Sequence, residues 1–308
     1  MSAHHLRGSL LLVAAMAGFS VSDALVQRAG SGLDAGQLAW LRYALLLLTA
    51  LPLALRQPGL LRSRRPFLQL GRAAGLVGSA VLFLQGIKTL PMAEATALVF
   101  ASPLYVTLLS ALLLHEPWRP WRHAPVLLGF AGVLVVAQPG GAGFDAGMLF
   151  PLLSSLAWAG AVLCTRLLSG SDPAPTTILY SAALGVLALA LPAARIDPGV
   201  FALQWPWLLA MAGSWCIAQW LIVWAYRIAP PSAIAPFSYS QLFWAALLGW
   251  MVFGQVPQGS TLLGIALIVL SGLWAAWMAR PRPELEPGSA HPGRRSVEPS
   301  AKSGPKHE

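Results

Sequence analysis

The stretch PMAEATALVFASPLYVTLLSALLLHEP, residues 91–117, contains an apolar run long enough to cross a lipid bilayer as one helix. About 20 mainly apolar residues are needed for such a crossing, and the run from Met92 to Leu114 holds one charged side chain, Glu94. Pro103 lies near the middle of the run and removes a backbone hydrogen bond. The stretch therefore predicts a membrane helix that is kinked near the centre of the bilayer.

A second stretch, residues 230–257, resembles the first in its proline, polar and helix-end positions. An apolar helix with glycines follows each stretch, so a unit of five helices used twice fits the chain. Because five is odd, the second copy would enter the membrane from the opposite side, which is the inverted-repeat architecture of many secondary transporters. Sliding the first stretch onto the second places Glu116 on Gln255, Tyr105 on Trp244 and Ser102 on Gln241. We call this register the repeat alignment.

Reading outward from these two stretches gives ten apolar runs separated by proline, glycine and charged residues. The sequence predicts an all-α integral membrane protein with ten transmembrane helices in two inverted five-helix repeats. We expect the first repeat within 1–138, the second within 147–279, and a disordered tail over 280–308, where six prolines occur among mixed charges. The runs are Gly8–Val26, Gln37–Leu55, Leu70–Ile87, Met92–Leu114, Ala124–Ala137, Gly147–Leu167, Pro175–Ala193, Trp205–Tyr226, Ser232–Phe253 and Ser260–Met278.

The composition excludes several classes of protein. Hydrophobic residues make up 56% of the 308 and charged residues only 10%, against about 25% charged in a soluble domain. A soluble enzyme, a disordered chain and a disulfide-rich secreted domain are therefore ruled out. The net charge of +9 comes from short clusters between apolar runs and not from one patch, so we expect no nucleic-acid partner. No Cys/His spacing suits a metal, and we expect neither metal nor cofactor.

The arginine and lysine positions predict the topology. If the N-terminus is cytoplasmic, 16 of the 20 basic residues fall on the cytoplasmic side. Membrane proteins carry their excess of positive charge in cytoplasmic loops. We therefore expect both termini in the cytoplasm, with four basic residues near the outer ends of the helices: Arg28, Arg42, Lys88 and Arg195.

Three charged residues within the predicted helices, Asp23, Arg42 and Glu94, are candidates for ion coupling or gating. A charge inside the membrane is costly, so it marks a functional position by default. The topology places all three in the outer third of the bilayer, where one arginine between two carboxylates could neutralise both. One carboxylate could then exchange its partner for a proton or a cationic substrate group. A static ion-pair network, or side chains that reach the headgroups, is the open alternative.

Polar and aromatic residues near the centre of the predicted helices are candidates for substrate binding. Repeat-related positions at mid-depth are where an inverted-repeat transporter would hold its substrate, and aromatic side chains suit a flat or partly apolar metabolite. Ordinary packing or lipid-facing aromatics remain the alternative. The candidate set is Ser102, Tyr105, Tyr180, Trp215, Ser238, Gln241 and Trp244.

The motifs together resemble a known family. Residues 93–97 (AEATA), Pro103, residues 129–133 (GFAGV) and, above all, residues 235–250 (APFSYSQLFWAALLGW) are similar to drug/metabolite transporters with EamA-type repeats. The resemblance covers roughly residues 8 to 279, but Gln255 stands where members often have Glu, and Leu242 where they often have Pro. It implies a ten-helix carrier of small metabolites in the cell inner membrane, working by alternating access.

An integral-membrane enzyme, such as a lipid or prenyl transferase, is the alternative function. Such enzymes usually present clustered acids or histidines at one interface, whereas the loops here are short and none has two acids close together. We therefore favour a transporter of a small molecule, embedded in the bilayer, with protons as the candidate coupling ion. A monomer and a homodimer both remain open.

Overall fold

The computed structural model describes residues 3–29, 32–113, 120–139, 145–168, 171–229 and 234–278, and within these ranges every regular element is a helix. The predicted tail, residues 280–308, lies outside the described residues. The elements are α1 (Ala3–Ala29), α2 (Ala35–Arg56), η1 (Pro58–Leu61), α3 (Pro66–Thr89), α4 (Met92–Val99), α5 (Ser102–Leu113), α6 (Pro120–Ala137), η2 (Ala146–Met148), α7 (Leu149–Leu168), α8 (Ala174–Ala188), α9 (Ala190–Ala193), α10 (Pro198–Ile228), η3 (Ala235–Tyr239), α12 (Ser240–Phe253) and α13 (Gly259–Met278).

The helices have the length and composition of membrane spans. In the described part of the chain, seven helical segments are long and apolar enough to cross a bilayer, and two further apolar helices, Ala124–Ala137 and Pro175–Ala188, are shorter. Large apolar side chains such as Leu203, Leu191 and Phe67 are exposed on the outside of the bundle. A lipid environment accounts for such exposure, and the all-helical fold agrees with the sequence prediction.

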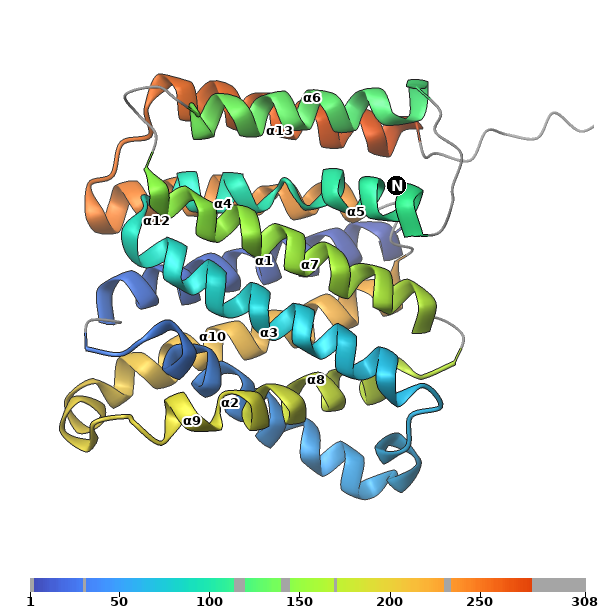
Figure 1. Cartoon of the computed structure of the whole chain (residues 1–308), viewed down its shortest axis with the longest axis vertical. Coiled ribbons are helices and arrows are strands. Elements are labelled where there is room, and N and C mark those ends of the chain that lie inside the picture. Colours follow the sequence, from blue (N-terminus) through green and yellow to red (C-terminus); the bar gives the residue numbers. More distant parts are fainter. Residues whose placement is uncertain are drawn as a thin grey trace, which may run out of the picture.

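The helices pack in pairs that join the two halves of the chain. Helix α1 packs against α10, α3 against α7, α2 against α8, α4 against α12, and α6 against α13, as the layers in Figure 1 show. Helices α1 and α7 run in opposite directions across the bundle. Helix boundaries recur in the repeat alignment, which places Thr89, the end of α3, on Ile228, the end of α10. It also places Pro120, where α6 begins, on Gly259, where α13 begins.

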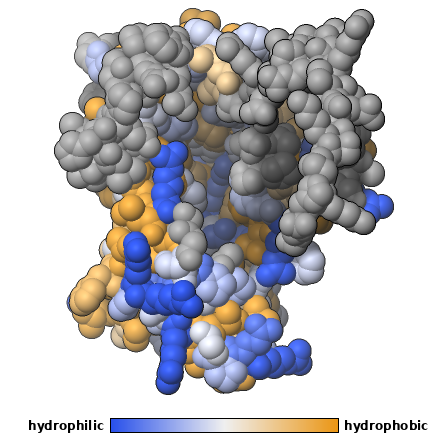
Figure 2. Space-filling model, turned by 90° about the vertical axis from the view of Figure 1, so that its right-hand side faces the viewer, coloured by the Kyte–Doolittle hydropathy of each residue, from blue (hydrophilic) through white to orange (hydrophobic). Residues whose placement is uncertain are grey.

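The two ends of the bundle differ in charge. Helix α1 begins and α13 ends at one end, which lies on the right in Figure 1; we call it the arginine-rich end and the other the opposite end. Figure 2 faces the arginine-rich end and shows long hydrophilic side chains on it. The basic residues at this end whose side chains the structure describes are Arg7, Arg56, Arg62, Arg64, Arg65, Arg72, Arg166 and Arg227. Those toward the opposite end are Arg28, Lys88 and Arg195, with Asp34, Asp145 and Asp197.

The helix expected over Met92–Leu114 is two helices in the structure. Helix α4 ends at Val99 and α5 begins at Ser102, and the link is tightened by 3₁₀-type bonds from the N–H of Phe100 to the Ala97 carbonyl (3.1 Å) and from Ala101 to Leu98 (3.1 Å). Proline disfavours a helical conformation in the residue before it and donates no hydrogen bond. The kink predicted at Pro103 is thus a break on its N-terminal side.

The outermost pair, α6 and α13, is held together by a close backbone contact between Gly132 and Gly264. A Cβ atom on Gly132 would lie 2.7 Å from the Gly264 carbonyl oxygen, and a Cβ on Gly264 would lie 2.6 Å from that of Gly132. Any larger residue would force the helices apart, so glycine is required at both positions. This pair stands along one side of the bundle (Figure 1), and α13 also packs on α4 and η3, which carry residues of the candidate site.

Candidate functional site

The site is built around an aromatic pair from the two halves, Phe100 and Tyr239. The rings stack with centroids 5.1 Å apart and an interplanar angle of 29°. The repeat alignment places one of these positions on the other. Phe100 lies at the break between α4 and α5, and Tyr239 at the junction of η3 and α12. Broken helices at the interface of two repeats are where transporters hold substrate.

The helices around this pair differ between the two ends of the bundle. Helix α4 packs against α12, on the side of the opposite end. Toward the arginine-rich end, α5 packs against α6 and α7, whereas η3 packs against α1, α12 and α13. Among the described residues, the two broken segments thus pack mainly on different helices at the arginine-rich end.

At the opposite end, polar contacts close the bundle. The Gln27 amide donates to the carbonyls of Ile87 (2.6 Å) and Leu90 (2.8 Å). The Gln255 amide donates to Gln27 Oε1 (3.4 Å), and Gln255 Oε1 accepts from the backbone N–H of Met92 (3.1 Å). We call Gln27, Gln255 and Met92 the glutamine clasp. The sequence reasoning noted Gln255 only as a departure from glutamate, and no sequence signal marked Gln27.

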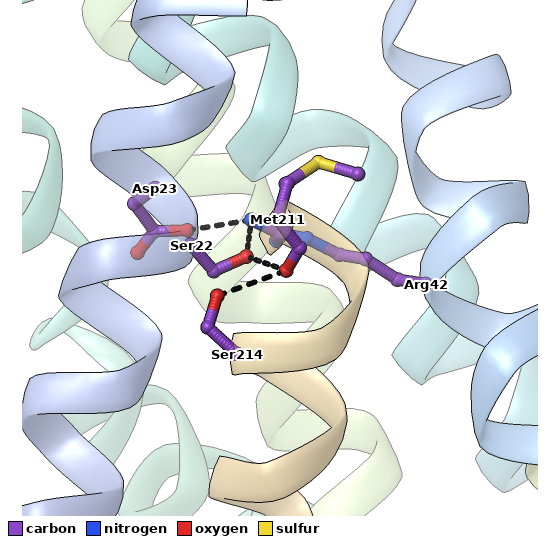
Figure 3. A network of polar contacts seen from close by, with 5 residues as sticks. All are labelled: Ser22, Asp23, Arg42, Met211 and Ser214. Atoms are coloured by element: carbon purple, nitrogen blue, oxygen red, sulfur yellow. Dashed lines mark hydrogen bonds and ion pairs between the residues drawn. The ribbon is translucent and has the colours of Figure 1, made fainter. Parts of the chain in front are cut away.

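A buried ion pair joins three helices beside the centre (Figure 3). Arg42 Nη2 of α2 bonds Asp23 Oδ1 of α1 at 2.9 Å, and both side chains are 4% exposed. The same nitrogen donates to the Ser22 hydroxyl (2.7 Å), which donates to the Met211 carbonyl of α10 (2.8 Å). Ser214 also donates to that carbonyl (3.1 Å). The network neutralises a buried charge pair and ties α1, α2 and α10 together.

Aromatic rings surround the ion pair. The Arg42 guanidinium carbon lies 6.0 Å from the ring centroid of Trp215, and Trp215 contacts Tyr43 edge-on at 5.6 Å and Phe19 at 6.3 Å. The Arg42 Nε is buried and has no bonded partner within the described structure. Trp215, predicted as a substrate residue, therefore lies with Arg42, predicted as a gating residue. Ser22 was not predicted as a site residue, although it precedes Asp23 in a stretch that resembles the family pattern.

Glu94 lies apart from the ion pair. Its Oε1 accepts from the Thr261 hydroxyl of α13 (3.3 Å), and Arg42 pairs with Asp23 alone in the described part of the chain. The expected network of one arginine between two carboxylates is therefore wrong. Similar depth in the membrane does not place residues on facing helices: α1 and α2 each pack on α10, whereas α4 faces α12 and α13.

The remaining predicted substrate residues fall in two places. Gln241 lies against α1, where its backbone carbonyl accepts from the Ser20 hydroxyl (3.4 Å). Trp244 packs on the α1–α10 core, and its buried indole N–H bonds no described group. The Tyr180 hydroxyl instead donates to the Leu61 carbonyl (3.0 Å) at η1. Ser102 begins α5, Tyr105 lies partly buried in that helix, and Ser238 lies in η3.

Comparison with known proteins gives consistent matches along the chain. The EamA-like transporter family model matches residues 6–138 and 145–277. A riboflavin transporter of Vibrio cholerae is 32% identical over 280 residues, covering 87% of this chain and 92% of the relative. A pseudopaline exporter of Pseudomonas aeruginosa is 30% identical over 269 residues, covering 86% and 94%. A solved crystal structure that is 24% identical, with a TM-score of 0.61, covers 88% of this chain and 97% of its own and shares the fold.

These matches decide between the two functions that the sequence left open. The family model accounts for both halves of the chain, and the relatives are transporters, not enzymes. The resemblance to EamA-type transporters is thereby confirmed, as is the expectation of a non-enzymatic role. The protein is a multi-pass membrane transporter of small metabolites and belongs to the EamA-like transporter family.

Proposed function

We propose that the protein is a secondary transporter that carries a flat aromatic metabolite of the flavin type across the cell inner membrane by alternating access. The observation that carries this proposal is the stacked pair of Phe100 and Tyr239. The two residues are related by the repeat and lie at the two helix breaks, so they stand where substrate would meet both halves.

The asymmetry of the two ends supports alternating access. The glutamine clasp holds α1, α3 and the segment after α12 together at the opposite end, while at the arginine-rich end α5 and η3 pack mainly on different helices. In the converse state the clasp breaks and the segments at the arginine-rich end come together. Two halves that run in opposite directions make these two states near-equivalent packings of the same helices.

The charge distribution supports a cytoplasmic arginine-rich end. Eight described arginines lie there, against two arginines and one lysine toward the opposite end. Positive loops stay on the cytoplasmic side. With α1 beginning and α13 ending at this end (Figure 1), both termini are cytoplasmic and the chain spans the membrane ten times.

The centre of the bundle offers groups that suit a flat ring with polar edges. A flat ring can stack on the aromatic pair, and base–aromatic stacking contributes about 1–3 kcal/mol. The buried indole N–H of Trp244 offers a hydrogen-bond donor that no described group uses. Ser102, Tyr105 and Gln241 complete the proposed lining. The named activity of the Vibrio cholerae relative, riboflavin transport, supports a ring system of this kind.

Glu94 is the proposed coupling carboxylate. Asp23 is held by Arg42 at 2.9 Å, whereas Glu94 makes one longer bond, 3.3 Å, to the hydroxyl of Thr261. Protonation of a carboxylate whose partner is neutral leaves no cation unpaired, whereas protonation of Asp23 would leave Arg42 buried without its counter-ion. The Asp23–Arg42 pair then serves as a fixed element of the gate, not as the site of proton exchange.

Uptake of labelled riboflavin into proteoliposomes tests the proposal. We expect Phe100→Ala and Tyr239→Ala each to reduce uptake by about fivefold or more, since each removes one stacking surface worth about 1–3 kcal/mol. Phe67→Ala, which removes a ring 87% exposed on α3, should leave uptake unchanged. Absence of uptake by the unmodified protein, or equal uptake by all four proteins, would contradict the substrate assignment. Glu94→Gln should abolish the response to a pH gradient.

A further inference from the structure

Arg72 of α3 forms a second arginine cluster, on the arginine-rich side of the centre. Its Nε donates to Thr165 Oγ1 of α7 (2.9 Å), and its Nη1 donates to the Thr177 carbonyl of α8 (3.2 Å) and to the Ser181 hydroxyl. The guanidinium is therefore fixed between three helices.

The hydroxyl groups of this cluster have no proton left to offer a ligand. Thr165 donates its own proton to the Ala161 carbonyl (2.8 Å), and Ser181 donates to the Thr177 carbonyl (2.8 Å). Their lone pairs accept from Arg72. The cluster is thus a set of neutral oxygens that orient a positive charge, with Nη2 of Arg72 bonded to no described residue.

The charge of Arg72 has no counter-ion in the described part of the chain, where Arg42–Asp23 is the one ion pair between side chains. The nearby carboxylate of Asp172 is occupied by other donors, namely the Ser63 hydroxyl (2.5 Å), the Arg64 N–H (2.9 Å) and the Gln69 amide (2.8 Å). A guanidinium held within a membrane helix without an acid is costly. It therefore favours an anion from outside the chain.

The related three-helix junction in the other half of the chain holds an arginine that does have an acidic partner. The repeat alignment places Arg42 on Ser181 and Arg72 on Met211. Helices α3, α7 and α8 thus meet as α10, α1 and α2 do. In the first junction Asp23 neutralises the arginine, whereas in the second the position related to Asp23 is Val162 and the position related to Arg42 is Ser181. The missing partner is specifically a carboxylate or an equivalent oxyanion.

We infer that Arg72 is the binding site for an oxyanion, a carboxylate or phosphate group, that reaches the protein at its arginine-rich end. A planar guanidinium binds such a group strongly and with defined geometry. Arg65, whose Nη1 donates to the Leu167 carbonyl of α7 (3.2 Å), adds positive charge at the same end of the bundle. The group belongs either to the solute on its way to the aromatic pair, which rests on the proposed function, or to a lipid headgroup.

The test uses the purified full chain in phosphatidylcholine nanodiscs, with sodium phosphate as the probe and sodium chloride at matched ionic strength as reference. Ligand binding to the folded state raises its unfolding midpoint. We expect phosphate to raise the midpoint of the unmodified protein and not that of Arg72→Gln. Arg227→Gln, which removes an arginine stacked on Trp224 at the same end, should respond like the unmodified protein, and Arg72→Lys should keep part of the response. No response, or an equal response in Arg72→Gln, would overturn the site.

Two further arms identify the source of the oxyanion. If phosphatidylglycerol in the nanodisc raises the midpoint through Arg72 and removes the phosphate response, the ligand is a headgroup. If the phosphate response persists, the site takes a free anion, and riboflavin 5′-phosphate should bind about tenfold more tightly than riboflavin, a preference lost in Arg72→Gln. Failure of both flavins to bind, with the phosphate response intact, would contradict the proposed function and leave the site standing.

Discussion

The two arginine clusters occupy related junctions but differ in how their charge is balanced. Around Arg42, a carboxylate lies at 2.9 Å, both partners are nearly sealed, and a serine links the pair to a third helix. Around Arg72, two hydroxyls and a carbonyl accept hydrogen bonds and no described acid is in contact. The first cluster is complete without a ligand, while the second leaves a charge to be matched.

The Arg42 cluster therefore stabilises helix packing, whereas the Arg72 cluster is available to bind a ligand. A buried ion pair is costly to break because one partner stays charged, so the Arg42 cluster holds α1, α2 and α10 in register. A guanidinium on neutral oxygens loses little when an anion comes and goes. Substitutions that remove a group from the Arg42 cluster, or add a carboxylate to the Arg72 cluster, test this difference.

The largest effect is expected from Asp23→Asn. The substitution leaves Arg42 buried without a carboxylate, and breaking a buried pair costs about 3–5 kcal/mol. Thermal unfolding in nanodiscs should show a fall of many degrees, or loss of folded protein. Arg72→Gln, which removes a charge that has no acid partner, should cost much less. Equal losses in the two variants would contradict the distinction between the clusters.

Ser22→Ala should have the next largest effect. The hydroxyl accepts from Arg42 and donates to the Met211 carbonyl. Its removal leaves one N–H of the Arg42 guanidinium unpaired at a cost of about 1–3 kcal/mol, while the carbonyl keeps its bond from Ser214. The matched substitution in the second cluster is Thr165→Val, whose side chain lies at an exposed position on α7. Unfolding midpoints should fall further for Ser22→Ala, and the reverse order would count against the account.

Ser181→Asp converts the second cluster into a copy of the first. The new carboxylate lies where the Ser181 oxygen already accepts from Arg72, so it should neutralise the guanidinium from within. We expect the phosphate-induced rise in unfolding midpoint to disappear, equivalent to at least a tenfold loss of affinity, or about 1.4 kcal/mol. Ser181→Ala, which adds no charge, should keep the response. An undiminished response in Ser181→Asp would show that Arg72 is not the anion site.

The smallest effect concerns pH and Asp172, next to the second cluster. Partial burial acts to raise the pKa of Asp172, but the bonds from Ser63, the Arg64 N–H and Gln69 outweigh it and hold the pKa below its ordinary value. A carboxyl group whose pKa is lowered on folding stabilises the fold above its unfolded pKa, about 3.9, and this contribution is lost as pH falls through the folded pKa.

Because Asp172 is only partly buried and solvent screens its charge, we expect the loss to be well under about 1 kcal/mol. Comparing unfolding midpoints of the unmodified protein and Asp172→Asn should show a difference at pH 7 that disappears toward pH 3. A difference that grows as the pH falls would have the wrong sign for this account.

Much of the fold could be predicted because apolar runs and their breaks are local properties of the sequence. The run over Gln37–Leu55 predicts α2 (Ala35–Arg56) to within two residues, and Pro103 signals the break before α5. The run over Trp205–Tyr226 falls short of α10, which begins at Pro198, because Asp197 caps it and Pro198 suits a first helical turn.

The site was harder to predict because it depends on which helices face each other. Charge alone marked Asp23 and Arg42, and they pair. It also grouped them with Glu94, which faces α13 instead. Gln27 carries no charge or motif signal, and the motifs that hold Ser22 and Tyr239 do not say which residues these two contact. The pairing of Phe100 with Tyr239 becomes visible only when the repeat alignment is combined with the packing of α4 on α12.

If the opposite end opens during transport, a covalent cross-link across the glutamine clasp should stop transport. Gln27→Cys and Gln255→Cys, with Cys164 and Cys216 replaced by alanine, would be joined in proteoliposomes by a short, reducible thiol cross-linker. The side chains of Gln27 and Gln255 are already in contact (3.4 Å). We expect cross-linking to stop riboflavin uptake and reduction of the cross-link to restore it. The cross-linker should have no effect on Gln27→Cys alone or Gln255→Cys alone. Full uptake by the cross-linked protein would contradict opening of the opposite end.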